Sequence, residues 1–180
     1  MKNVCRIGLL AFVGTLVAAF AVGAGEQKST SLEKRLLGAW SLASNVLVDQ
    51  DGKKSEPYGA DAKGTVIFSG KRVALMITRA ELPKFASNNR TTGTAEENKA
   101  AVAGTIAYFG SYEVNEAEKV LTMHLEGCTF PNWAGTDQKR NIELTGDELK
   151  FINKSPSMGQ GLITVTWKRI KEPQKTASAK

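Results

Sequence analysis

The chain has 180 residues and a net charge of +6, from 24 lysines and arginines against 18 aspartates and glutamates. Its single histidine and two cysteines exclude a Cys/His zinc site, a disulfide framework and a CxxC redox motif. The length suits one domain of about 150 residues behind a leader segment.

Residues 1–24 have the composition of a signal peptide. Lys2 and Arg6 form a short basic region, and residues 7–24 carry no charged side chain. Small residues near position 24 suit cleavage by signal peptidase. An uncleaved anchor is the alternative, because an apolar run of about 18 residues reaches the lower limit of a membrane span. We expect an exported protein, periplasmic or secreted, whose net charge is +4 once Lys2 and Arg6 are lost.

The segments that flank the folded domain are polar. Residues 25–31 form a linker, the domain is expected over residues 32–171, and residues 172–180 form a disordered tail. A Thr-x-x-Glu capping box at residues 30–33 predicts a short helix that ends at Gly38.

Eight segments beyond this helix have the signals of β-strands. Apolar and polar side chains alternate along them, and turn sequences such as Asp51-Gly52 and Gly146-Asp147 separate several neighbours. The segments cover residues 40–48, 65–68, 73–77, 108–114, 120–125, 138–144, 149–153 and 162–170. Eight short strands with tight turns are typical of an antiparallel barrel or sandwich, so the fold class is all-β.

Two segments interrupt the strands. A second capping box, from Thr94 to Glu97, predicts a helix that runs to about Gly104, between the third and fourth strands. The apolar side chains of this helix are mostly alanines, so it packs weakly or lies across an opening. The other interruption is the segment 129–136, where a proline and a glycine prevent a continuous strand.

Motifs spread over about residues 33–170 are shared with a known family. A Pro-Asn-Trp-x-Gly-Thr-x-Gln-x-Arg run ends at Arg140, and a Gly-x-Trp motif ends at Trp40. Further matching segments are Tyr108–Val114, His124, Gly146–Leu149 and Val165–Arg169. Together they resemble the small bacterial and fungal lipocalin-like domain family. The resemblance implies an eight-stranded antiparallel up-and-down calycin-like barrel with an internal cavity, and Arg169 stacked over Trp40, but no particular ligand.

Alternation along the strands identifies the side chains that would point into such a barrel. An eight-stranded barrel has room for its own side chains or for one small ligand. A filled core and a lined cavity have the same apolar pattern, so both interpretations stay open. The side chains expected to face inward are Trp40, Leu42, Leu75, Ile77, Tyr108, Tyr112, Phe151, Val165 and Trp167.

Arg140 is a charged residue on an apolar strand face. It alternates with Ile142 and Leu144, and Gln138 shares the same face. A buried arginine is costly unless it is paired and hydrogen-bonded, so we expect a partner. One interpretation is an anchor for a ligand carboxylate or carbonyl, which suits the planar guanidinium. The alternatives are a place in water at the barrel mouth, or an internal partner among Glu113, Glu126, Asp137 and Trp133.

His124 and Glu126 are the candidates for acid and base. They lie two residues apart on one strand, so they share a face about 6.5 Å apart. Cys128 is four residues from His124, about 13 Å along a strand, which is too far for a nucleophile and its base. We interpret Cys128 as a small buried apolar residue. His124 should point outward, because the opposite face carries the better core residues, Leu121, Met123 and Leu125.

These patterns favour a binding protein that holds one small, mostly apolar or amphipathic molecule in the barrel. No catalytic residue, cofactor or metal is assigned. Nucleic acid is not a predicted partner because the basic residues are dispersed, and a membrane would be contacted only through an uncleaved N-terminal segment. The alternatives are an isomerase, cyclase or hydrolase that uses the cavity, and a filled barrel that acts in the cell envelope through surface contacts. The candidate ligand-binding residues are Arg140, Tyr108, Tyr112, Gln138 and Trp133, the last as a plug or gate of the barrel end.

Overall fold

The computed structural model describes residues 30–171, and residues 1–29 and 172–180 lie outside the described part. The expected signal peptide or anchor at residues 1–24, most of the linker and the C-terminal tail therefore fall outside it. Within the described range, no helix combines the length and the apolar character needed to cross a membrane.

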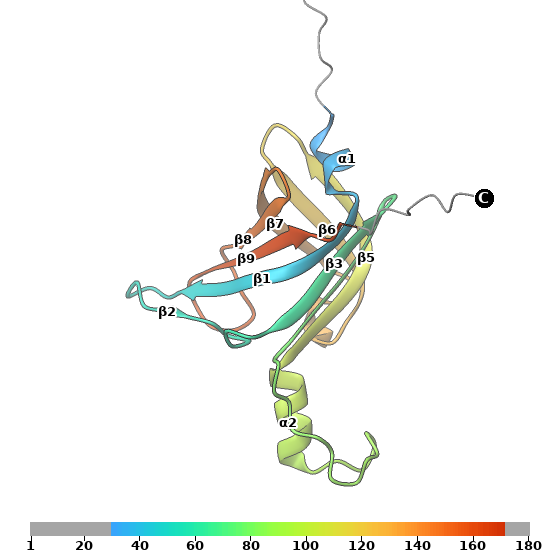
Figure 1. Cartoon of the computed structure of the whole chain (residues 1–180), viewed down its shortest axis with the longest axis vertical. Helices are drawn as coiled ribbons and strands as arrows, with labels where there is room; N and C mark the ends of the chain where they lie inside the picture. Colours follow the sequence, from blue (N-terminus) through green and yellow to red (C-terminus); the bar gives the residue numbers. More distant parts are fainter. Residues whose placement is uncertain (1–29, 172–180) are drawn as a thin grey trace, which may run out of the picture.

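The described chain forms a closed antiparallel barrel of eight strands (Figure 1). The strands are β1 (Gly38–Val48), β3 (Lys63–Ser69), β4 (Arg72–Thr78), β5 (Thr105–Asn115), β6 (Val120–Cys128), β7 (Asp137–Thr145), β8 (Glu148–Asn153) and β9 (Leu162–Arg169). Each strand pairs with its neighbour in sequence, and β1 pairs with β9 to close the sheet. A two-residue strand, β2 (Lys54–Ser55), pairs with the far end of β1. The expected all-β, up-and-down barrel is confirmed.

One end of the barrel is closed by α1 (Leu32–Leu36) (Figure 1). Nε1 of Trp40 donates to the Leu36 carbonyl oxygen at 2.9 Å, and both side chains are fully buried. The guanidinium carbon of Arg169 lies 3.9 Å from the centre of the Trp40 ring, and its Nη1 donates to the Leu37 carbonyl oxygen at 2.8 Å. The stacking implied by the family resemblance is therefore confirmed.

The cap of α1 lies one residue later than expected. Ser31, not Thr30, is the N-cap, and its Oγ accepts the Lys34 N–H at 3.3 Å. The first two N–H groups of the helix are accepted by the carboxylate of Glu116, at 3.0 and 3.1 Å. The predicted capping box at residues 30–33 is therefore wrong. The carboxylate of Glu116, which is distant in the sequence, accepts hydrogen bonds from N–H groups in the first turn instead.

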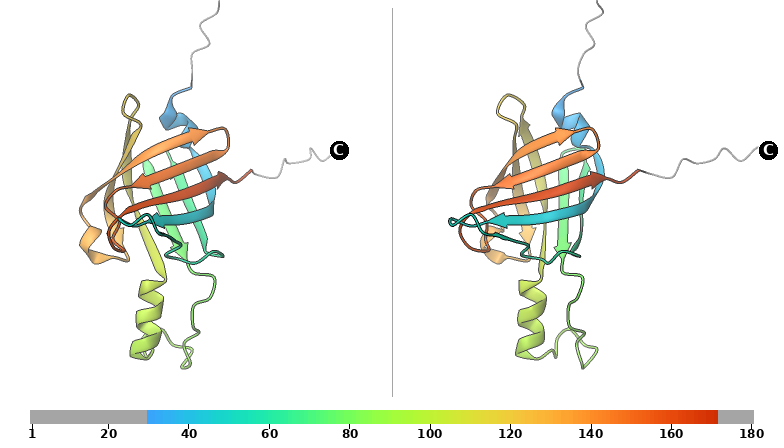
Figure 2. Two further views of the ribbon diagram at one scale, coloured as in Figure 1. Left: turned by 90° about the vertical axis from the view of Figure 1, so that its left-hand side faces the viewer. Right: turned by 60° about the vertical axis from the view of Figure 1, so that its left-hand side comes forward.

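The helix α2 (Ala95–Ala103) extends away from the other end of the barrel (Figure 2). Thr94 and Glu97 form the expected capping box, so the predicted start of the helix is confirmed. None of the α2 residues is buried. Weak packing is therefore confirmed, whereas a position across the barrel opening is wrong, because the alanine-rich helix has little apolar surface to bury.

Side chains fill the half of the barrel nearest α1. Tyr112 packs edge-on against Phe68 with ring centres 5.0 Å apart, and its hydroxyl donates to the Gly70 carbonyl oxygen at 3.0 Å. Every side chain expected to face inward is buried, except Leu42 and Val165, which are half-buried. The barrel is thus filled at its closed end.

Candidate ligand-binding cavity

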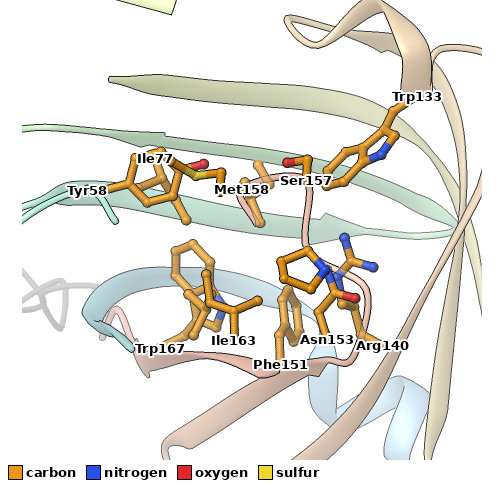
Figure 3. A pocket seen from close by; sticks show the side chains of 13 residues that line it. Tyr58, Ile77, Trp133, Arg140, Phe151, Asn153, Ser157, Met158, Ile163 and Trp167 are labelled. Carbon is orange, nitrogen blue, oxygen red and sulfur yellow. The ribbon is translucent and has the colours of Figure 1, made fainter. Parts of the chain in front are cut away.

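A cavity of about 60 Å³ lies inside the barrel, beside the loop that joins β8 and β9. Figure 3 shows the side chains that line it. This volume holds a few water molecules, whereas pockets for drug-sized ligands measure about 300–1,000 Å³. A molecule with an aromatic ring therefore requires the wall to move outward. Six of the side chains that line the cavity are Tyr58, Ile77, Trp133, Arg140, Phe151 and Trp167.

Arg140 reaches the cavity wall from β7. Its exposed fraction is only 6 %, so the guanidinium is largely withdrawn from water. Nη1 donates to the Lys139 carbonyl oxygen at 2.7 Å, and the guanidinium carbon lies 5.5 Å from the centre of the Trp133 ring. Of the expected internal partners, the aromatic ring is the one that the structure places beside Arg140.

No carboxylate pairs with Arg140 within residues 30–171. A cation that is buried without a counter-charge is costly, and it gains most from an oxygen acceptor that carries negative or partial negative charge. The position therefore suits a carboxylate, phenolate or carbonyl oxygen of a ligand. All three acids expected as internal partners are exposed: Glu113, Glu126 and Asp137.

Trp133 lies between the cavity and the outside. It ends η1 (Pro131–Trp133), a single 3-10 turn in the loop between β6 and β7. Its ring contacts Phe130 and Tyr108 edge-on, with centres 5.7 and 6.3 Å away. The indole lines both the cavity and an outer groove of about 600 Å³, and Arg140 lines the same two spaces. The two side chains therefore separate the cavity from the groove.

Tyr58 lines the cavity from the segment between β2 and β3, and the sequence analysis missed it. The carboxamide of Asn45 holds this segment: its oxygen accepts the Tyr58 N–H at 3.0 Å, and its nitrogen donates to the Gly59 carbonyl oxygen at 3.1 Å. Burial raises the pKa of Tyr58 to about 12. The available signal was Asn45, a polar residue in a buried strand position.

The loop of residues 154–161 covers the cavity between β8 and β9. Residues 156–158 line the cavity, as Figure 3 shows for Ser157 and Met158. At the start of the loop, Oδ1 of Asn153 accepts the Ser155 N–H at 3.0 Å. The loop contains no helix or strand, so it lacks the backbone hydrogen-bond ladder that holds the strand walls together.

The other predicted ligand contacts occupy three separate places. Tyr108 packs behind Trp133, where burial raises the pKa of its hydroxyl and the positive charge of Arg140 opposes that rise. Gln138 lies in the outer groove rather than the cavity. Tyr112 lies in the filled half of the barrel. The structure therefore brings Arg140 and Trp133 to the cavity, with Tyr108 as a supporting side chain.

His124 and Glu126 lie on the outer face of β6, as expected for His124. Nδ1 of His124 is 2.6 Å from Oδ1 of Asp137. Both carboxylate oxygens of Glu126 accept hydrogen bonds from the guanidinium of Arg72, and the bond from Nη2 to Oε2 is 2.8 Å long. This hydrogen bonding lowers the pKa of Glu126 from its ordinary value. Since neither side chain faces the cavity, neither can act on a molecule inside it.

Cys128 is half-buried at the end of β6, not fully buried as expected. Burial raises the pKa of its thiol, and its Sγ accepts the Phe130 N–H at 3.3 Å. The β5–β6 pairing shifts register between Phe109 and Gly110, close to the pair that Tyr108 forms with Cys128. Within the described residues, the structure has no group of three or more metal-ligating side chains.

Two comparisons with known proteins agree with this architecture. The family described as a lipocalin-like domain matches residues 37–170, which include all eight barrel strands and the cavity. A 4'-hydroxy-3'-methoxypropiophenone carrier protein of Aspergillus oryzae is 26 % identical over 108 residues, which are 54 % of this chain and 96 % of the relative. The chain therefore belongs to the lipocalin-like domain family.

Proposed function

We propose that the barrel binds and carries one small, mostly apolar molecule whose polar end contacts Arg140. The observation that carries this proposal is a buried guanidinium at the wall of an apolar cavity, with no acid paired to it in residues 30–171. An apolar pocket with a few polar groups is the usual form of a small-molecule site. The name of the fungal relative supports a carrier role.

An aromatic ketone with a phenolic hydroxyl is the ligand class that we propose first. The relative is named for such a compound. Trp133 and Phe151 supply aromatic surface on the cavity wall, and Arg140 supplies a donor for a phenolate or carbonyl oxygen. Entry requires the loop of residues 154–161 and the Trp133 side chain to move, because the cavity of about 60 Å³ is smaller than such a molecule.

The test is calorimetric titration of the purified protein with 4'-hydroxy-3'-methoxypropiophenone. Arg140→Met replaces the charged side chain by an apolar one of similar length, so the affinity for the ketone should fall about tenfold or more. Arg72→Met is the matched control, because Arg72 lies on the outer face and pairs with Glu126. The control should bind like the wild type.

The same variants separate an anchor from a structural support. If Arg140 is an anchor without an internal partner, Arg140→Met should leave the free energy of unfolding unchanged or raise it. A loss of about 3 kcal/mol or more would indicate a buried internal pair instead. Unchanged affinity in Arg140→Met, or no binding to the wild type, would contradict the proposal.

A filled barrel that acts through surface contacts is the second candidate, and the small volume of the cavity favours it. Native mass spectrometry of the purified protein distinguishes the two candidates. A stoichiometric small molecule, recovered by solvent extraction, supports a carrier. No bound mass, together with no calorimetric response to the ketone, supports a filled barrel. A cavity enzyme has less support, because His124 and Glu126 lie outside the barrel.

We also propose that the protein is exported, to the periplasm or outside the cell. The support is the sequence of residues 1–24, with Lys2 and Arg6 before an uncharged apolar run. Mass spectrometry of the purified chain reads its first residue. A chain that begins near residue 25 supports cleavage and export, whereas a chain that begins at Met1 in the membrane fraction supports an anchor.

A further inference from the structure

We propose that the cavity holds a second polar contact, in which the indole N–H of Trp167 donates to an uncharged oxygen of the ligand. This inference rests on the proposed function and makes it more specific. The ligand then carries two acceptors, one that contacts Arg140 and one that contacts Trp167 at the inner end of the cavity, with an apolar body between them. Nothing in the fungal relative's name assigns this contact.

The first observation is that Trp167 has a buried donor without a partner. Its exposed fraction is 0 %, and among the described residues its Nε1 is the one buried side-chain nitrogen or oxygen that lacks a hydrogen bond. Buried indole N–H groups usually find an acceptor, because an unsatisfied buried donor destabilises the protein. Trp40, equally buried, donates to the Leu36 carbonyl oxygen. Of these two tryptophans, only Trp167 therefore lacks an acceptor for its indole N–H.

The second observation is that the Trp167 side chain lines the same cavity as Arg140. Figure 3 shows Trp167 and Arg140 at opposite ends of one wall, with Ile163 and Phe151 between them. Asn153, beside Arg140, pairs with Ile163, and Trp167 lies four residues farther along β9, about 13 Å of strand. A single elongated molecule along this wall would lie beside both side chains.

The third observation concerns the charge of the ligand group that would accept the Trp167 N–H. Most of the wall nearest this end is apolar: Phe151 packs edge-on against the Trp167 ring at 5.9 Å, and Leu75 and Val165 line the same space. The polar exception is Tyr58, which Figure 3 shows at the same end on the facing wall. A carboxylate would lose its hydration there without gaining a counter-charge. A carbonyl, ether or hydroxyl oxygen has a much smaller desolvation cost, so the inner acceptor is uncharged.

The test uses two probes that differ in one group. They are 4'-hydroxy-3'-methoxypropiophenone and 2-methoxy-4-propylphenol, in which a methylene replaces the ketone carbonyl. Trp167→Phe removes the N–H and keeps an aromatic ring. Calorimetry should show about fivefold tighter binding of the ketone by the wild type, and Trp167→Phe should abolish this preference. Trp40→Phe is the matched control and should keep the preference.

A second measurement uses the wild-type protein, so it does not require that any variant folds. In a two-dimensional proton–nitrogen spectrum, the chain's three tryptophans give three indole N–H signals. The ketone should move the Trp167 signal downfield, as a new hydrogen bond does, and the propylphenol should not.

The outcomes separate this inference from the proposed function. Equal binding of both probes by the wild type, or an equal loss for both in Trp167→Phe, overturns the second contact and leaves the carrier function standing. An unshifted Trp167 signal in the ketone complex overturns it in the same way. If the wild type binds neither probe, the carrier function as proposed fails, and the second contact fails with it.

Discussion

The guanidinium of Arg140 and the indole of Trp133 lie 5.5 Å apart and together separate the inner cavity from the outer groove. The two side chains come from elements of different rigidity. Arg140 projects from the middle of β7, whereas Trp133 ends a three-residue turn in a loop. If the proposed ligand enters from the groove, it passes this pair, and we expect Trp133, on the loop, to be the side chain that moves.

Changes at Trp133 should therefore alter both the affinity and the rate of ligand release. Trp133→Ala removes the aromatic wall and the contact with Arg140, so affinity for 4'-hydroxy-3'-methoxypropiophenone should fall about tenfold and release should be faster. Trp133→Phe keeps a ring and should retain most of the affinity. Calorimetry and a ligand-exchange experiment measure the two quantities. Equal or tighter binding by Trp133→Ala would show that the indole blocks the cavity instead of lining it.

The closed end should contribute to stability and not to binding. Arg169 stacks on Trp40 and donates to two backbone carbonyl oxygens, of Leu37 and Arg35, at 2.8 and 2.6 Å. Arg169→Met should lower the free energy of unfolding by about 2 kcal/mol, because these charged hydrogen bonds and the stacking are lost. Urea unfolding measures the change, and exposed Lys168→Met is the control. A large effect on ligand affinity would contradict this division of roles.

Gly161 should be required at the end of the loop that covers the cavity. Its φ is +133°, and a Cβ there would lie 2.2 Å from the Val48 carbonyl oxygen. Gly161→Ala should destabilise the protein by about 2 kcal/mol or more, since the backbone must shift. Gly52→Ala is the control: its φ is +79°, but its Cβ would meet open space. Thermal unfolding compares the two, and an equal cost for both would rule out the close approach at Gly161.

The tyrosines should make the fold sensitive to high pH. Burial raises the pKa of Tyr58 to about 12 from an ordinary value of 10.0, and it also raises the pKa values of Tyr108 and Tyr112. Because the unfolded chain ionises first, the tyrosines' contribution to stability is intact below pH 10 and is lost as the pH rises toward 12.

Absorbance at the tyrosinate band and circular dichroism, recorded together across that range, measure this effect. Tyrosinate should form at a pH above the ordinary tyrosine pKa of 10.0, and it should form as the protein unfolds. Tyr58→Phe should reduce the loss of stability between pH 10 and 12. Titration of all three tyrosines at their ordinary pKa values in the folded protein would contradict the burial of these hydroxyls.

The sequence was sufficient for the barrel because alternation and turns are local signals. The strand segments, the inward side chains and the capping box at Thr94 follow from spacing along the chain, and the structure agrees with them. The cap of α1 does not follow, because Glu116, which binds its first N–H groups, is more than 80 residues away in sequence. Such partners are set by the closed barrel and not by local pattern.

The cavity was predictable only in part, for a similar reason. The sequence places Arg140 as a charge on an apolar strand face and predicts Trp133 as one of its possible partners, which the structure places beside it. Tyr58 and residues 156–158 lie on segments without strand periodicity, so nothing in their spacing indicates that they face the cavity. Tyr112 and Tyr108 share a strand face, but depth along the barrel separates them, and alternation carries no information about depth.

A crystal structure of the protein with 4'-hydroxy-3'-methoxypropiophenone tests the central claim most directly. We expect the ring of the ligand inside the barrel between Trp133 and Phe151, one oxygen within hydrogen-bonding distance of the Arg140 guanidinium, and the loop of residues 154–161 moved outward. Ligand density confined to the outer groove beside Gln138, with the cavity and the loop unchanged, would contradict it.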